Sequence, residues 1–206
     1  MSEFEKQQHD NINDSNAKIE NKKKNIKREL LEWAATILVA LLISLLIRGF
    51  LIEHTVVEGP SMEDTLLSGQ HLIVYKLGYF FSPPEREDII VLKRGGLFNN
   101  IILPDPKGVD YIKRIIAVPG DTLDIKAGSV YLNGKKLNET FVKGETFGQG
   151  MEYPMKIPPK KVFVMGDNRD VSYDSRYPEV GLIDYSKIKG KAVLRVFPFK
   201  KIGILH

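Results

Sequence analysis

The 206-residue sequence contains no cysteine and only four histidines, at positions 9, 54, 71 and 206. The absence of cysteine excludes disulfide bonds, thiol catalysis and zinc or iron–sulfur sites built on cysteine. No two histidines are close in sequence, so a histidine-based metal site is not expected either. The sequence therefore predicts no metal site built on cysteine or histidine.

The composition also excludes two broad classes of protein. With 43% hydrophobic residues the chain is not disordered as a whole, and its 17 glycines and 11 prolines favour a turn-rich fold over a coiled coil. The net charge of +4 suits either nucleic acid or an anionic membrane surface. Because no nucleic-acid-binding motif is present, no nucleic-acid partner is predicted.

The first 29 residues differ sharply from those that follow. Residues 1–29 carry seven Lys or Arg, six Asp or Glu and almost no apolar side chains, which predicts a disordered tail. Residues 33–47 then form an uncharged apolar run, which extends to residues 30–52 if Glu32 and Arg48 are tolerated near its ends. A membrane span needs roughly 20 residues, and charged side chains near its ends can reach the headgroups.

We therefore expect residues 30–52 to form a single transmembrane signal anchor. A buried core helix would show a polar stripe, and a cleaved signal peptide would have a shorter lead and a small-x-small cleavage site. The basic cluster at residues 22–28 precedes the run, so the positive-inside rule places the N-terminus in the cytoplasm. Residues 53–206 are then extracytoplasmic, attached to the cell membrane.

Residues 53–206 are predicted to be mainly β. Short β-branched and aromatic runs, separated by turn residues, lie at 71–77, 88–93, 111–118, 129–137, 161–166 and 191–197. Asn133-Gly134 predicts a two-residue hairpin turn, and no long amphipathic helix supports a βαβ arrangement. A short helical turn is expected after Ser61, ending at Gly69, and residues 138–159 are expected to form a loop or small subdomain away from the core.

Three polar stretches of this region are candidates for chemistry. Ser61 follows Gly59-Pro60 at the start of a turn, where backbone N–H groups could hold an oxyanion, although a serine there is also typical of a helix N-cap. Lys113 lies in a strand and shares a face with Tyr111 and Ile115, where burial would lower its pKa and make it a usable base. A lysine extending from an edge strand is the alternative.

The third stretch is a dense polar loop at residues 165–181. Such a loop is either a solvated connection or a hydrogen-bonded scaffold for a site. It carries Asp167, Asn168, Arg169, Asp170, Ser172, Asp174, Ser175 and Arg176. A Ser–His–Asp arrangement is not favoured, because His71 opens a strand and His54 adjoins the end of the apolar run.

In this order behind one apolar run, the three stretches resemble the motifs of bacterial type I signal peptidases, in particular the single-span enzymes of Gram-positive bacteria. The resemblance extends from Leu30 to Phe199 and rests on GPSMEDTL, YIKRIIAVPGD and GDNRDVSYDSR. It implies a transmembrane helix followed by a mainly β signal-peptidase (LexA-like) catalytic domain. It also implies a small irregular subdomain inserted at roughly residues 122–160.

The resemblance assigns roles to individual residues. Ser61 matches the nucleophile and Lys113 the general base, while Gly59 and Ser172 match positions that support the oxyanion and orient the lysine. The remaining matches are structural positions around the site: Met62, Arg114, Asp167, Asn168, Arg169, Asp174 and Arg176. In many Gram-negative members a serine stands at the place of Gly59, so here the oxyanion would rely on backbone N–H groups.

The implied function is that of a membrane-bound serine endopeptidase, which removes signal peptides by cutting after small residues of the Ala-x-Ala type. Its partners would be pre-proteins emerging from the secretion machinery, and the lipid bilayer. The resemblance implies that no metal ion and no organic cofactor is required. The alternative is a catalytically silent relative that acts as an assembly factor, but such a relative should have lost Ser61 or Lys113. Asp64, Gln70 and Ala117 depart from the family pattern, and Asp64 replaces a proline close to the serine.

Overall fold

The computed structural model of the protein describes residues 27–45, 47–93 and 110–205. These fall into two compact units that divide between Arg48 and Gly49. In the first unit, residues 27–45 form an α-helix, so residues 27–29 of the predicted tail are helical, while residues 1–26 lie outside the described part. Within the described residues, no helix has both the length and the apolar character needed to cross a membrane.

The apolar segment predicted at residues 30–52 is not one continuous α-helix. The α-helix is described up to residue 45, and a π-helical turn, η1 (Ile47–Leu51), follows it. Ile52 already belongs to strand β1 (Ile52–Val56) and pairs with Tyr75. The helical expectation therefore fails at its C-terminal end, because the backbone of Ile52 takes part in a sheet.

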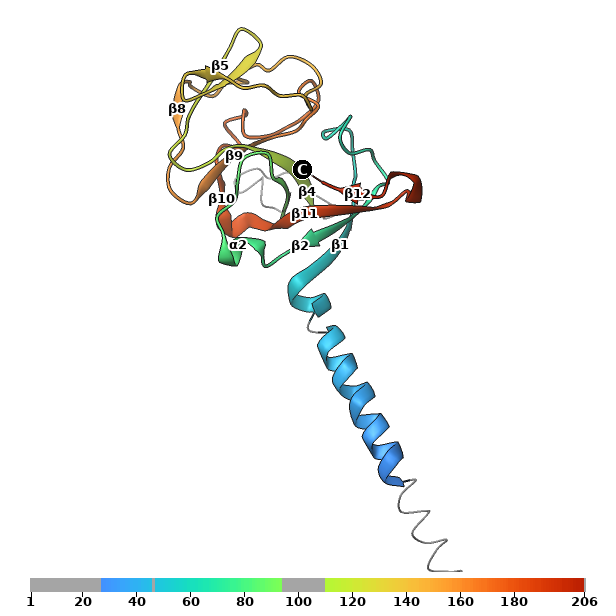
Figure 1. The fold of residues 1–206 in the computed structure, drawn as a ribbon. Helices are drawn as coiled ribbons and strands as arrows, with labels where there is room; N and C mark the ends of the chain where they lie inside the picture. The colour runs from blue at the N-terminus through green and yellow to red at the C-terminus, as the bar shows by residue number, and fades with distance from the viewer. Residues whose placement is uncertain (1–26, 46, 94–109, 206) are drawn as a thin grey trace, which may run out of the picture. The chain divides into compact units, whose positions relative to one another are not determined.

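The second unit is built on one antiparallel sheet of eight strands (Figure 1). Its strands lie in the order β1-β2-β11-β3-β4-β9-β10, and β12 pairs with β11. Besides β1 they are β2 (His71–Tyr75), β3 (Ile89–Leu92), β4 (Tyr111–Ala117), β9 (Lys161–Met165), β10 (Ile183–Asp184), β11 (Ile188–Phe197) and β12 (Gly203–Ile204). The prediction of a mainly β domain is confirmed, and each predicted run contains a strand.

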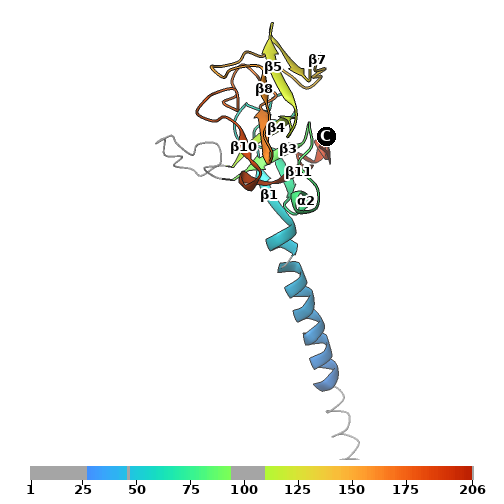
Figure 2. The same ribbon diagram turned by 90° about the vertical axis from the view of Figure 1, so that its left-hand side faces the viewer.

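A second antiparallel sheet has the order β7-β6-β5-β8. Its strands are β5 (Thr122–Lys126), β6 (Ser129–Leu132), β7 (Lys135–Lys136) and β8 (Met155–Lys156), all within residues 122–160. Asn133 and Gly134 have φ of 52° and 81°, as the predicted hairpin turn requires. In both views this small sheet lies beyond β4 and β9, away from β1 (Figures 1 and 2).

Helical structure is scarce in the second unit. The described helical segments there are α2 (Gly78–Phe81), η2 (Tyr185–Lys187) and η3 (Phe199–Lys201). The helical turn expected after Ser61 is only a series of turns, with one helix-like hydrogen bond from Leu66 N to Met62 O at 2.8 Å. Gly69, with φ of 84°, ends this segment by donating its N–H to the carbonyl of Val57 at 2.9 Å.

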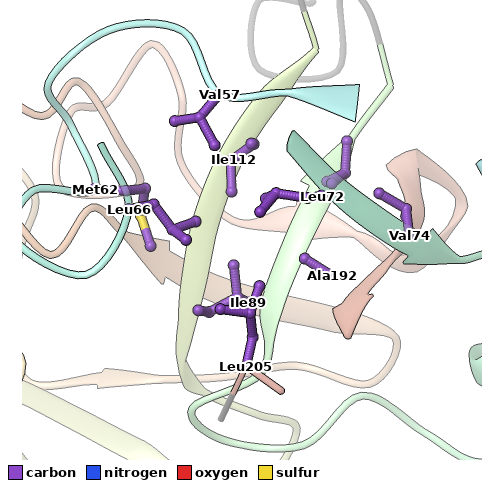
Figure 3. Close-up of a cluster of buried hydrophobic side chains, with 10 residues drawn as sticks. Val57, Met62, Leu66, Leu72, Val74, Ile89, Ile112, Ala192 and Leu205 are labelled. Carbon is purple, nitrogen blue, oxygen red and sulfur yellow. The ribbon is translucent and has the colours of Figure 1, made fainter. Parts of the chain in front are cut away.

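Three clusters of buried apolar side chains hold the domain together. In the first, Val57, Met62 and Leu66 meet side chains of β2, β3 and β4 (Figure 3). The third cluster combines Phe163 of the main sheet with Val130 and other residues of the small sheet. The expectation that the segment around residues 138–159 lies away from the core is therefore wrong, since Ile157 is also buried in this third cluster.

A β-bulge modifies the predicted alternation of β4. Residues 111–114 pair regularly with β3, but the register against β9 shifts between Ile115 and Ala117. Ile116 and Ala117, which strict alternation would put on opposite faces, are both buried in the third cluster. The bulge inserts one unpaired residue and bends the strand, so the predicted two-residue period ends at Ile115.

Candidate active site

The turn that carries Ser61 is held from two directions. Gly59 has φ of 82°, a conformation that favours glycine, and it changes the chain direction just before the serine. On the far side, Met62 is 1% exposed and Leu66 is fully buried in the first cluster. We refer to residues 59–66 as the Ser61 turn.

The third polar stretch supplies further contacts to the Ser61 turn. The Asn168 N–H donates to the carbonyl of Ser61 at 3.1 Å, and its side-chain amide donates to the carbonyl of Pro60 at 3.2 Å. With both carbonyls held by one residue, the backbone around the serine is fixed while the hydroxyl is left for other contacts.

That hydroxyl meets the lysine selected from the sequence. Lys113 Nζ lies 2.9 Å from Ser61 Oγ, although the two residues are 52 positions apart. The amine also donates to its neighbouring carbonyl, Ile112 O, at 3.1 Å. Lys113 is 3% exposed, so the alternative of a lysine extending into solvent from an edge strand is wrong.

Burial changes the acidity of this lysine. Desolvation of the charged amine lowers the pKa of Lys113 to about 8, against the raising effect of the nearby carboxylates of Asp174 and Asp167. The cation of Arg176 lowers this pKa further. A substantial fraction of the amine is therefore neutral near neutral pH, and a neutral amine next to a hydroxyl can accept its proton.

Buried ion pairs support the two segments that meet here. Arg114, adjacent to the lysine, forms a two-pronged pair with Asp167 at 2.9 and 2.8 Å. Arg176 forms a similar pair with Asp174 at 2.8 and 3.0 Å. All four side chains are nearly inaccessible, and two parallel hydrogen bonds per pair offset part of the cost of burying the charges.

Ser172 lies close to the Ser61 turn, and its hydroxyl bonds within its own loop. Its hydroxyl accepts from the N–H of Gly166 at 3.1 Å, and the hydrogen bonds described for the lysine go to Ser61 and Ile112. The packing is very close, because a Cβ on Gly166 would lie 2.3 Å from both Ser172 Oγ and Ser61 O. The structure thus places Ser172 near the site, but without the hydrogen bond to Lys113 that the resemblance implies.

A pocket opens next to Ser61 between two chain segments. The lining residues come from 57–62 on one side and from 110–113 on the other, and include Gly59, Ser61 and Lys113. His54 and His71 lie on β1 and β2 with ring nitrogens 3.0 Å apart, but neither lines this pocket. In the described part of the chain, no three His, Asp or Glu side chains are placed to hold a metal ion.

Several residues around the site were missed by sequence reasoning. Glu139 and Thr146 contact the guanidinium of Arg169, and Phe141 lies under the guanidinium of Arg114, at 4.0 Å from the ring centre. They belong to an irregular segment without a hydrophobic period, so no local pattern signalled that it would reach the site.

The domain is mainly β, and a buried lysine contacts a serine beside a pocket. This combination indicates a Ser–Lys hydrolase. The chain belongs to the signal peptidase family, peptidase S26, which it matches over residues 30–197. It is therefore a serine peptidase of that family.

Two relatives of similar sequence agree with this assignment. The chain is 39% identical to signal peptidase I of Bacillus licheniformis over 191 residues, covering 89% of this chain and 97% of the relative. It is 36% identical to signal peptidase I S of Bacillus subtilis (strain 168) over 185 residues, covering 85% and 94%. A crystal structure of a signal peptidase I from Enterococcus faecalis V583 matches with a TM-score of 0.41 and 26% identity, over 53% of this chain and 97% of that one.

Proposed function

We propose that the protein removes signal peptides from secreted pre-proteins, with Ser61 as the nucleophile and Lys113 as the general base. The observation that carries this proposal is the 2.9 Å contact between the buried amine of Lys113 and the Ser61 hydroxyl. Membership of the signal peptidase family, by way of residues 30–197, supports the substrate class.

The proposed reaction begins with an extended substrate. The cleavage region of the pre-protein pairs with the backbone at residues 57–61 and 110–113, which line the pocket, in the manner of an added β-strand. Small side chains at the −3 and −1 positions, of the Ala-x-Ala type, suit a site with Val57 and Ile112 as buried apolar lining.

The chemical steps follow from the positions of two side chains. Neutral Lys113 takes the proton of Ser61 Oγ, and the oxygen attacks the scissile carbonyl. Backbone N–H groups, first that of Ser61, stabilise the oxyanion, since Gly59 offers no hydroxyl. The protonated lysine then donates its proton to the leaving amine, and water hydrolyses the acyl-enzyme. Ser172 and the two buried ion pairs hold this arrangement in place.

The proposal includes a membrane anchor in the apolar segment that begins at residue 30 and ends before β1, with the N-terminus in the cytoplasm and the catalytic domain outside. The uncharged apolar run at 33–47 and the basic cluster before it support this topology. Confinement to the membrane plane would raise the effective concentration of substrates that emerge there. Resistance of the protein to alkaline extraction from membranes, and digestion of the domain by protease added outside intact cells, test this part.

Cleavage of a purified pre-protein with an Ala-x-Ala site, by the full chain in detergent, tests the function. The parent should cut after the alanine, and Ser61→Ala and Lys113→Ala should each lose at least about a thousandfold in rate while remaining folded. Lys126→Ala is the matched control, because this lysine lies on the small sheet with its side chain 60% exposed. A parent that is inert on several pre-proteins would contradict the proposal and favour a relative that only binds.

A further inference from the structure

Residues 139–146, called the strap below, are part of the connection between β7 and β8. They contact both segments that meet at Ser61 and Lys113. Lys143 is the centre of these contacts. Its N–H donates to the carbonyl of Asp167 at 2.9 Å, and its carbonyl accepts from the N–H of Arg169 at 2.8 Å. The strap thereby forms a one-residue parallel bridge with Asn168.

The bridged residue is the one that fixes the Ser61 turn. Asn168 donates its backbone N–H to Ser61 O at 3.1 Å and its side-chain amide to the preceding carbonyl at 3.2 Å. The backbone of Lys143 holds the residues on either side of Asn168. A displacement of the strap would therefore reach the serine through only one intervening residue.

The side chain of Lys143 contacts the same turn directly. Its ammonium lies 3.5 Å from Asp64 Oδ1 and 3.7 Å from Glu63 Oε2, which are three and two residues after the serine. Asp64 stands where the resemblance to the family expects proline, which would offer no charge to this lysine. Asp64, which departs from the family pattern, thus has an ionic partner in the strap, Lys143.

The strap is itself firmly anchored. The buried guanidinium of Arg169 pairs with Glu139, at one end of the strap, and with the hydroxyl of Thr146 at the other. Between them, the ring of Phe141 lies under the guanidinium of Arg114, at 4.0 Å. Breaking a buried charge pair is costly because the remaining charge stays desolvated. Both ends of the strap are therefore fixed, and this fixes the backbone from which the exposed Lys143 ammonium extends.

From these contacts we infer that the strap is part of the active-site framework and that Lys143 is a positioning residue. Its ammonium contacts the Ser61 turn directly, and its backbone supports the same turn indirectly through Asn168. This inference rests on the proposed function of Ser61, and it concerns kcat more than substrate binding. Lys143 does not line the pocket, so loss of its charge should misplace the hydroxyl without removing a contact to substrate.

The experiment compares kcat and KM of the full chain on an Ala-x-Ala pre-protein for the parent, Lys143→Met, Lys143→Arg, Asp64→Asn and the double variant with methionine at 143 and asparagine at 64. Methionine keeps the apolar stem and removes the charge. Because the pair is largely exposed, we expect Lys143→Met to lose a factor of about two to five in kcat, with KM and the melting temperature unchanged. Lys126→Met, on the small sheet, is the matched control and should keep the parent kcat.

Three further results are expected from a positioning role. Lys143→Arg should restore the parent kcat, the double variant should be no slower than Lys143→Met, and added salt should slow the parent towards the rate of Lys143→Met. Parent kcat in Lys143→Met, or losses that add in the double variant, would overturn the inference. If the parent itself does not cleave, the proposed function has failed instead, so the two failures are distinguishable.

Discussion

The sharpest prediction concerns the pH dependence of cleavage. Burial lowers the pKa of Lys113 from 10.5 to about 8. With a pKa of about 8, about one amine in ten is neutral at pH 7, compared with about three in ten thousand for an ordinary lysine. The fold thus raises the population of the proposed base about 300-fold, which corresponds to about 3 kcal/mol. The same burial destabilises the folded protein when Lys113 is charged.

The assay is kcat/KM of the purified full chain between pH 6 and 10.5, which reports the groups that titrate in the free enzyme. We expect a tenfold rise per pH unit up to about pH 8 and a plateau above it. His54 and His71 contact each other outside the pocket, so a variant with glutamine at both positions is the control and should keep the same limb. An acid limb centred near pH 10 would refute a depressed pKa at the base, and a flat profile from pH 6 to 9 would refute a pKa of about 8.

Two other predictions follow from the same packing. Lys113→Met should be inactive yet more stable than the parent at pH 7, by up to about 3 kcal/mol in urea unfolding, because it removes a buried charge. Between pH 8 and 10.5 the unfolded parent binds more protons than the folded parent, so the stability of the parent rises with pH and its difference from Lys113→Met should shrink. Equal urea-unfolding midpoints of the two proteins at pH 7 would contradict the predicted stabilisation. Gly166→Ala should cost about 1–3 kcal/mol in stability and at least about tenfold in kcat, because its Cβ would meet Ser172 Oγ and Ser61 O at 2.3 Å. Gly203→Ala, whose Cβ meets nothing within 4 Å, is the control, and a Gly166→Ala enzyme with parent activity would show that the site tolerates the displacement.

Much of the main sheet could be predicted from short local patterns in the sequence. The runs that became β2, β4 and β9 are rich in β-branched residues and bounded by turn formers, and Asn133-Gly134 marked its hairpin correctly. The first strand, β1, was not predicted, because the expected anchor was extended past Arg48 to Ile52. Local hydrophobicity does not distinguish the end of a helix from the start of a strand there.

The residues around the site were only partly predictable. Ser61, Lys113 and the polar loop at 165–181 stood out as residue types in unusual surroundings, and the motifs together indicated their family. The contacts of Ser172 differ from those implied by the resemblance, since its hydroxyl accepts from the N–H of Gly166 and the described bonds of Lys113 go to Ser61 and Ile112. The bulge at Ile116 and the strap could not be foreseen, since neither has a sequence period of its own.

By itself the sequence determined the candidate residues, the β character of residues 53–206 and the family. These depend on residue type and on patterns within about ten positions of the chain. Only the tertiary structure decided that Lys113 meets Ser61 at 2.9 Å, that burial lowers the lysine pKa, and that Lys143 reaches Asp64. Such contacts join positions 52 and 79 residues apart, and they depend on the register of β3, β4 and β9 and on the packing between the two sheets, which no local pattern encodes.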